Sequence, residues 1–277
     1  MTRVTAPFGR RAASVTARER HGPYVVVRCR DTAGPQPQPG QFYMLAAAER
    51  WGGGEGGRPF LPRAFSVLRA TPRPEGIELH FLIEDVGPGT KRLSELGPGD
   101  DLAIVGPLGN GFGPPGEGRT PLLVGGGVGI APLAIWQDEL GAGGTESRVL
   151  LGFRDDDHAR GSALFTDATL ATDDGSAGHH GLVTDLLEDE LDARDDRGDD
   201  VEVYACGPPP MLEAVRAICN DHNTPAQLAL ESGMACGFGA CFGCVVPTVD
   251  GYVRLCVDGP VLDAHRLQSA LVAGAGH

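Results

Sequence analysis

The chain has 277 residues, of which 41% are hydrophobic and 22% charged, a balance typical of a folded globular protein rather than a disordered or membrane-spanning one. Its formal net charge of -14 disfavours nucleic acid and acidic membrane surfaces as partners, because both are negatively charged. No apolar stretch approaches the roughly 18 residues of a membrane span, and the N-terminus lacks the apolar run of a signal peptide, so we expect a cytoplasmic protein.

The N-terminal part of the chain predicts an antiparallel β-barrel or sandwich. Short β-rich runs alternate there with Gly and Pro turns. Strands are expected at 24–30, 41–47, 63–70, 77–87 and 101–109. Residues 51–60, WGGGEGGRPF, are expected to form a surface loop, because clustered glycines pack poorly and have high chain entropy.

The pattern changes after the Pro/Gly-rich segment 109–119. Strands are predicted at 120–126, 147–153 and 201–207, and helices at 131–140, 182–191 and 209–220. Strands that alternate with helices indicate a parallel α/β sheet. From about residue 227 the composition changes again, to Gly and Cys. We therefore predict an α+β multidomain protein with a β-barrel domain (1–115), an α/β domain (116–226) and a small C-terminal module (227–277).

Two strand ends of the α/β region suit a nucleotide. One apolar strand runs into a glycine-rich turn before a helix, and a second ends in a short motif before the next helix. The residues concerned are Gly125, Gly126, Gly127 and Gly129 in the first, and Cys206, Gly207 and Pro208 in the second. Glycine allows close approach to a pyrophosphate, and the carboxyl ends of parallel strands share one crevice. A tight packing turn and a buried structural thiol are the alternatives for the two motifs.

In the barrel region, Arg63 and Ser66 lie on one predicted strand beside Phe65. Arginine can contact phosphate through two hydrogen bonds, and serine can donate to a flavin. Further along, Gly89 and Thr90 begin a predicted helix whose free N–H groups favour an anion. The acidic runs at 154–160 and 187–200 are interpreted as solvent-exposed surface, with a salt-adapted host as an open alternative.

Four of the seven cysteines, Cys236, Cys241, Cys244 and Cys256, follow the spacing C-x4-C-x2-C with a later fourth cysteine. This is the spacing of plant-type [2Fe–2S] proteins. Zinc remains the alternative, since thiolates bind it too, although zinc sites usually contain two C-x2-C pairs. The surrounding glycines leave N–H groups free to hydrogen-bond cluster sulfides.

Taken in order, several motifs resemble the ferredoxin-NADP reductase superfamily, and within it most closely the electron transfer subunits of NAD-dependent dihydroorotate dehydrogenases. The motifs are PGQFYML, RAFS, GPGT, GGGVGIAP, GLVTDLL, YACGPPPML, MACGFGACFGCVV and RLCVDGPVLDA, and they span nearly the whole chain. The resemblance implies a barrel that binds FAD, an α/β domain that receives NAD, and a C-terminal module that holds a [2Fe–2S] cluster.

The resemblance also implies individual roles. It assigns FAD contacts to Arg63, Ala64, Phe65, Ser66, Leu82, Ile83, Glu84, Gly89 and Thr90. It assigns the nicotinamide nucleotide to Gly125 to Gly129 and Cys206 to Pro208, and the cluster to the four cysteines. Phe65 stands where many superfamily members have tyrosine, so one hydroxyl contact to the flavin is missing. The acidic run after Phe153 favours NAD over NADP, although Arg154 could contact a 2′-phosphate.

As a whole, the resemblance implies an oxidoreductase subunit of pyrimidine (UMP) biosynthesis that carries electrons from a separate FMN-containing catalytic subunit to NAD. We expect a heterotetramer with two copies of each subunit, and no dihydroorotate-binding catalytic residue on this chain. One alternative is a related reductase subunit that serves sulfide or polysulfide, a hydrogenase, or ferredoxin-linked NADP reduction. The other is a zinc-containing nucleotide-binding regulatory module without redox activity.

Overall fold

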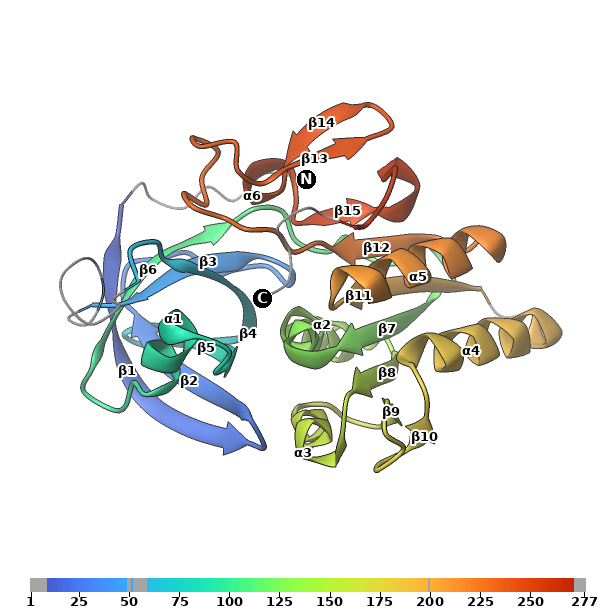
Figure 1. Ribbon diagram of the computed structural model, residues 1–277, viewed down its shortest axis with the longest axis horizontal. Helices are drawn as coiled ribbons and strands as arrows, with labels where there is room; N and C mark the ends of the chain where they lie inside the picture. The colour runs from blue at the N-terminus through green and yellow to red at the C-terminus, as the bar shows by residue number, and fades with distance from the viewer. Residues whose placement is uncertain (1–8, 49–50, 52–58, 199, 272–277) are drawn as a thin grey trace.

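A computed structural model describes residues 9–48, 51, 59–198 and 200–271. The chain forms a barrel, a seven-stranded sheet with helices on both faces, and a small module that carries a β-hairpin (Figure 1). The expected loop at 51–60 lies largely outside the described residues, as do the last six residues of the chain, 272–277. No helix in the described ranges is long and apolar enough to span a membrane.

The barrel is closed, with the strand order β1-β2-β5-β4-β3-β6. Its strands are β1 (Arg11–His21), β2 (Tyr24–Asp31), β3 (Phe42–Ala47), β4 (Arg63–Arg73), β5 (Gly76–Glu84) and β6 (Asp101–Leu108), and α1 (Pro88–Ser94) follows β5. All neighbouring strands pair antiparallel. Every residue of β3 is buried, which explains its unbroken apolar sequence.

Strand β1 was not among the strands expected from the sequence. Only Ala13 and Val15 of its residues are buried, and its second half, ARERH, is polar. A strand whose outer part faces solvent shows no apolar run, so the pattern failed to reveal it. Pairing with both β2 and β6 closes the barrel.

The sheet has the order β10-β9-β8-β7-β11-β12-β15, in which β15 alone runs antiparallel to its neighbour among the described pairings. Its strands are β7 (Thr120–Gly126), β8 (Arg148–Phe153), β9 (Ala168–Thr172), β10 (His179–His180), β11 (Val201–Cys206), β12 (Ala226–Ala229) and β15 (Val261–Asp263). The connecting helices are η1 (Gly127–Ile130), α2 (Ala131–Ala142), α3 (Asp156–Ala159), η2 (Arg160–Leu164), α4 (Val183–Arg197) and α5 (Pro209–Asp221). This confirms the predicted parallel sheet.

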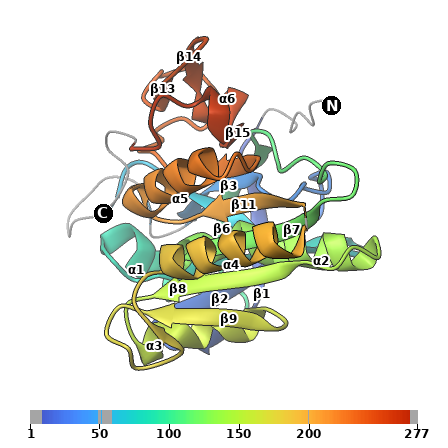
Figure 2. The same cartoon turned by 90° about the vertical axis from the view of Figure 1, so that its right-hand side faces the viewer.

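Alternate residues of β7 face the two layers of helices. Leu122 and Val124 pack in one core with residues of α4 and α5, whereas Leu123 packs in the other core with residues of α2. Figures 1 and 2 show α4 and α5 side by side on one face of the sheet. Helix α2 packs against β4, and its Ile135 belongs to the barrel core, so this helix joins the barrel to the sheet.

The C-terminal module leaves the sheet after β12 and returns to it at β15. Between them lie the hairpin β13 (Val245–Thr248) and β14 (Gly251–Arg254) and the short helix α6 (Leu255–Asp258), and η3 (Ala264–Arg266) follows β15. The predicted boundary between residues 226 and 227 falls inside β12, so β12 and β15 extend the sheet with residues assigned to the module. In Figure 2 the hairpin projects from the rest of the chain.

Candidate functional site

The predicted flavin residues line a split in the barrel wall. The ladder between β4 and β5 ends at the pair Val67 and Phe81, and beyond it β4 continues to pair with β3, and β5 with β2. Residues 63–66 and 82–84 therefore lie on the two sides of the split. Their facing backbone groups have no ladder partner, and such groups are available to the polar edge of a ligand. Ala64 is exposed and Phe65 half-buried, which leaves an apolar surface there.

The structure brings Arg63 to the start of α1. A Cβ built on Gly89 would lie 3.1 Å from Arg63 Nε and 3.3 Å from Cζ, so the guanidinium lies directly against the first turn of the helix. The Thr90 hydroxyl instead stabilises the turn, because it accepts hydrogen bonds of 3.0 Å from both Val86 N and Gly87 N. Arg63 and Gly89 thus form a cationic corner beside the split, where a phosphate group could bind.

The glycine-rich turn after β7 is shaped mainly by close packing. Gly125 is the register partner of Cys206 on β11, as expected for two strand ends that border one crevice. A Cβ on Gly129 would lie 2.6 Å from Gly207 Cα and 2.7 Å from Gly207 N, so the two motifs touch through their backbones. At Gly127, which has φ +54°, a Cβ would meet nothing within 4 Å. Gly127 therefore faces open space.

Met211 is a residue of this crevice that the sequence analysis missed. A Cβ on Gly126 would lie 2.5 Å from Met211 Sδ, and one on Gly207 would lie 2.7 Å from the same atom. The thioether therefore covers both glycines at the carboxyl edge of the sheet. Cys206 is buried beneath, and burial raises the pKa of its thiol well above the ordinary value. Pro208 caps α5 in extended geometry.

A second missed feature joins the flavin strand to the α/β domain. His158 Nε2 lies 3.3 Å from Glu84 Oε1, and His158 Nδ1 lies 2.6 Å from Asp155 Oδ1. Arg154 Nη2 also approaches Glu84 Oε1, at 3.6 Å. The interpretation of residues 154–160 as solvent-exposed surface is wrong for His158, which is buried. A polar run in sequence hid this residue, because its partner Glu84 lies 74 positions away and becomes close only in the folded chain.

The cluster cysteines fall into two pairs. Cys244 Sγ and Cys256 Sγ lie 3.2 Å apart and both residues are buried, whereas Cys236 is half-buried and Cys241 exposed. Although burial acts to raise it, backbone N–H groups of Cys241, Phe238 and Ala240 lower the pKa of Cys236 to about 6. Burial and the hydrogen bond with Cys244 raise the pKa of Cys256 to about 12. The loop around Cys236 thus favours a thiolate, whereas binding of a metal by Cys256 would have to displace its proton.

The donor set fits the [2Fe–2S] cluster implied by the sequence. A two-iron cluster takes four thiolates, two on each iron, and the chain supplies two close pairs. No group of three or more His, Cys, Asp or Glu side chains that could hold one metal ion is found in the described part of the chain. The backbone supports the pairs, because Gly237 at φ +78° and Gly239 at φ +88° bend the loop in a way that other residues rarely adopt.

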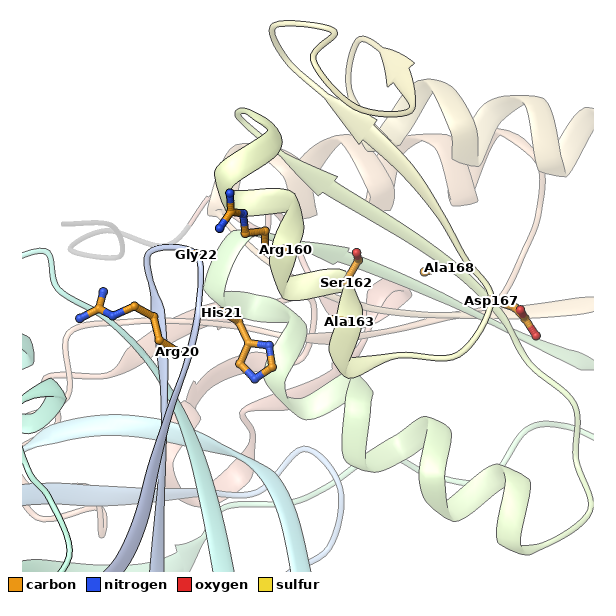
Figure 3. Close-up of a pocket in the computed structure, with 8 residues that line it drawn as sticks. All are labelled: Arg20, His21, Gly22, Arg160, Ser162, Ala163, Asp167 and Ala168. Carbon is orange, nitrogen blue, oxygen red and sulfur yellow. The ribbon is translucent and has the colours of Figure 1, made fainter.

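A cavity of about 540 Å³ lies elsewhere, between the β1–β2 turn and the segment from η2 to β9 (Figure 3). It is lined by Arg20, His21, Gly22, Arg160, Ser162, Ala163, Asp167 and Ala168. None of the predicted site residues is among them. The side chains of Arg20 and Arg160 do not converge in Figure 3, and we place the chemistry in the split and the crevice instead.

The chain is similar in sequence to known electron transfer subunits. A sequence model of the iron-sulfur cluster binding domain of dihydroorotate dehydrogenase B matches residues 231–268. The chain is 38% identical to the dihydroorotate dehydrogenase B (NAD(+)) electron transfer subunit of Caldanaerobacter subterraneus subsp. tengcongensis, over 84% of this chain and 88% of the relative. The subunit of the same name from Geobacillus sp. (strain WCH70) is 37% identical over 82% and 85%.

The chain belongs to this family of electron transfer subunits. As a dihydroorotate dehydrogenase B electron transfer subunit it is an oxidoreductase subunit, as predicted. A solved structure of NADH-dependent reduced ferredoxin-NADP oxidoreductase, studied for flavin-based electron bifurcation, matches with a TM-score of 0.78 and 25% identity, over 96% of this chain and 93% of that one. The ferredoxin reductase in carbazole 1,9a-dioxygenase has the same fold, with a TM-score of 0.62, 24% identity and coverage of 78% and 65%. The predicted barrel, sheet and cluster module are confirmed.

Proposed function

We propose that this subunit carries electrons between a catalytic dihydroorotate dehydrogenase subunit and NAD+, through a [2Fe–2S] cluster and FAD, in pyrimidine biosynthesis. The observation that carries the proposal is the arrangement of two cysteine pairs, a split barrel wall and a glycine-lined crevice on one reductase fold. When bound, FAD exchanges electrons in twos with a nicotinamide and singly with an iron–sulfur cluster, which makes it the necessary converter.

The residues of the split would hold the flavin. The strand ends at 63–66 and 82–84 offer backbone groups to its ring system, and Arg63 beside Gly89 offers a guanidinium to its pyrophosphate. Glu84 is held at the end of β5 by His158 and Arg154. These contacts fix the edge of the split against the α/β domain.

The crevice would receive the nicotinamide nucleotide. Gly127 faces open space at the carboxyl edge of the sheet, and Gly129 and Gly207 allow the two strand ends to meet there. We propose NAD rather than NADP, since Arg154, the cation nearest in sequence to the end of β8, is engaged by carboxylates. Its Nη2 lies 3.6 Å from Glu84 and its Nε 3.6 Å from Asp155.

We place the docking face for the catalytic subunit around the cluster loop and the adjacent hairpin. Phe238 and Phe242 of the loop and Tyr252 of the hairpin expose their rings, although large apolar side chains are usually buried. Exposed aromatic residues are enriched in protein interfaces. We further propose an FMN-containing partner and an assembly with two copies of each subunit, and the molar mass of the purified complex tests this stoichiometry.

The test is co-expression with the catalytic subunit, followed by anaerobic purification of the complex. We expect FAD and iron-bound sulfide in the preparation, and reduction of NAD+ on addition of dihydroorotate, with slower reduction of NADP+. Zinc without iron, in a protein to which no flavin binds, would contradict the proposal and favour the regulatory module. If the complex contains a flavin and a cluster but dihydroorotate does not reduce NAD+, only the proposed substrate is contradicted.

One specific observation favours a second candidate. The match to the NADH-dependent reduced ferredoxin-NADP oxidoreductase structure covers nearly the whole chain with a TM-score of 0.78. A related reductase subunit, serving reduced ferredoxin, a hydrogenase, or sulfide or polysulfide, would have the same cofactors and another partner. Reduction of NADP+ or NAD+ by reduced ferredoxin, in the absence of dihydroorotate, distinguishes it.

A further inference from the structure

Arg254 contacts the cluster loop at two separate turns. It is the last residue of β14, directly before the helix that carries Cys256. Its Nη1 donates a hydrogen bond of 3.1 Å to the carbonyl oxygen of Gly239. Its Cζ lies 5.4 Å from the centroid of the Phe242 ring, within the range of a cation–π contact. One side chain therefore ties together the two turns that flank Cys241.

The peptide group that Arg254 contacts is itself directed at the thiols. The Gly239 carbonyl and the Ala240 N–H belong to the same peptide unit, and this N–H donates to Cys236. The N–H of Gly239 donates to Cys256. A hydrogen bond from a cation to the carbonyl polarises the unit and strengthens the bond that its N–H makes. Through the unit that it contacts, Arg254 thus acts on the sulfur of Cys236, whereas the N–H that donates to Cys256 belongs to the preceding peptide unit.

The turn at Phe242 needs such support, because residues other than glycine rarely adopt its backbone conformation. Phe242 has φ +58°, a conformation that is strained in a residue other than glycine and persists only where its surroundings enforce it. Gly239 has φ +88°, and a Cβ there would lie 3.2 Å from Arg254 Nη1. The guanidinium fills the space beside Gly239 and covers one face of the Phe242 ring.

Charge makes the position of Arg254 significant for redox chemistry. The loop from Glu231 to Cys244 contains no lysine or arginine, and the whole chain has a formal net charge of -14. Asp258 partly neutralises Arg254, since its Oδ2 lies 3.7 Å from Arg254 Nε and accepts a hydrogen bond of 2.9 Å from Arg254 N. A fixed positive charge favours the reduced cluster, which is more negative than the oxidised one.

We propose that Arg254 is a positioning residue that sets the reduction potential of the cluster, by holding the turns at Gly239 and Phe242 against the cysteine sulfurs and by placing a positive charge beside them. The inference rests on the proposed function, because it requires that the cysteines bind a [2Fe–2S] cluster. It concerns the equilibrium between oxidised and reduced protein, and is therefore tested without any measurement of turnover.

The experiment is a redox titration of the anaerobically purified full-length chain, followed by electron paramagnetic resonance. In Arg254→Met we expect the ratio of reduced to oxidised cluster at a fixed potential to fall three- to tenfold, where tenfold corresponds to about 59 mV for one electron. Arg254→Lys keeps the charge and loses the planar contacts, so we expect a smaller shift together with altered g values. An unshifted midpoint in a fully loaded Arg254→Met protein would overturn the inference.

Arg266→Met is the matched control. Arg266 is in the same module, is similarly exposed, and is also paired with a carboxylate, at 3.6 Å from Asp250, which lies in the turn of the hairpin rather than in the cluster loop. We expect its midpoint to equal that of the unmodified chain, and an equal shift in both variants would overturn a specific role for Arg254.

A fourth variant covers the case in which Arg254→Met fails to hold the cluster. Asp258→Asn preserves an acceptor for the Arg254 N–H and removes the neutralising charge, so we expect the midpoint to rise, and an unchanged or lower midpoint would overturn the inference. If the unmodified chain contains no reducible [2Fe–2S] signal, the proposed function fails first, and this outcome is distinguishable from all the others.

Discussion

The turn at residues 125–129 and the loop at residues 233–243 are both rich in glycine, for different physical reasons. In the turn, a Cβ on Gly125, Gly126 or Gly129 would collide with neighbouring atoms, so glycine permits close packing between strand ends. In the loop, Gly237 and Gly239 have positive φ, and the bends direct N–H groups at cysteine sulfurs. Glycine therefore permits close approach of two strand ends in one region, and in the other it permits backbone bends that orient N–H groups.

The largest expected effect comes from removing a thiol of the loop. In Cys256→Ser we expect loss of the visible absorption of the cluster, because serine replaces a soft thiolate ligand with a poor one. Cys219→Ser is the control, since Cys219 is equally buried but lies in α5. Absorption and iron content check both variants, and a fully occupied, reducible cluster in Cys256→Ser would show that the fourth ligand was wrongly chosen.

The second-largest effect is expected on stability, when a substitution disturbs close packing in the turn at residues 125–129. Gly129→Ala places a Cβ 2.6 Å from the backbone of Gly207, which cannot move without displacing β11. We expect the free energy of unfolding to fall by about 3 kcal/mol and NAD binding to weaken. Gly127→Ala meets no atom within 4 Å, so its positive φ should cost only about 1 kcal/mol. Urea unfolding of the two variants measures the difference, and equal losses would refute the packing explanation.

A third pair tests backbone direction in the loop. Gly239→Ala combines φ +88° with a Cβ 2.7 Å from Val257 Cγ2, so we expect several-fold lower cluster occupancy after reconstitution. In Gly243→Ala the nearest atom lies 3.6 Å away and no positive φ is required, so occupancy should stay near that of the unmodified chain. Iron and sulfide per chain provide the measurement. Full occupancy in both would mean that glycine is not needed to direct the backbone.

The smallest expected effect concerns a contact between α5 and the C-terminal end of the described chain. Glu213 of α5 accepts hydrogen bonds of 3.0 Å from Ser269 Oγ and 2.5 Å from Ala270 N, in the C-terminal part of the cluster module. The Arg216 guanidinium, with these N–H and O–H groups, lowers the pKa of Glu213 to about 2 from an ordinary 4.5. The charge therefore stabilises the fold above about pH 4.5, and this stability is lost as the pH falls toward 2.

In Glu213→Gln we expect the free energy of unfolding to fall by about 1 kcal/mol at pH 7, and the difference from the unmodified chain to shrink below pH 4.5. Glu75→Gln is the control, because Glu75 pairs with Arg30 on an exposed surface, where ion pairs contribute little. Denaturant unfolding at several pH values checks this, and a difference independent of pH would exclude the carboxylate charge as its source.

The sequence allowed prediction of the parts whose chemistry is local. Cysteine spacing, glycine-rich strand ends and apolar runs depend on neighbouring residues, and for this reason the cluster module, the central strands β7, β8 and β11, the helices α2, α4 and α5 and most barrel strands were predictable. The solvent-facing strand β1 was not, because half of it lacks an apolar pattern. The contact of His158 with Glu84 joins residues far apart in the chain. The periodicity of apolar residues carries no information about such a contact. For the same reason the contacts of Met211 with Gly126 and of Arg254 with Gly239 could not be predicted.

The pairing of β12 with β15 has a consequence for how such a chain can be assembled and re-engineered. Ala229 and Val261 are register partners, and Leu230 N donates a hydrogen bond of 3.0 Å to Pro260 O, so the segment between them begins and ends at neighbouring points. The cluster-bearing segment is therefore an insertion between adjacent strands, and a short connection could in principle close the same gap. A redox centre positioned in this way enters and leaves the sheet at one point, although its buried residues Val246, Leu255 and Val257 share the core of that sheet.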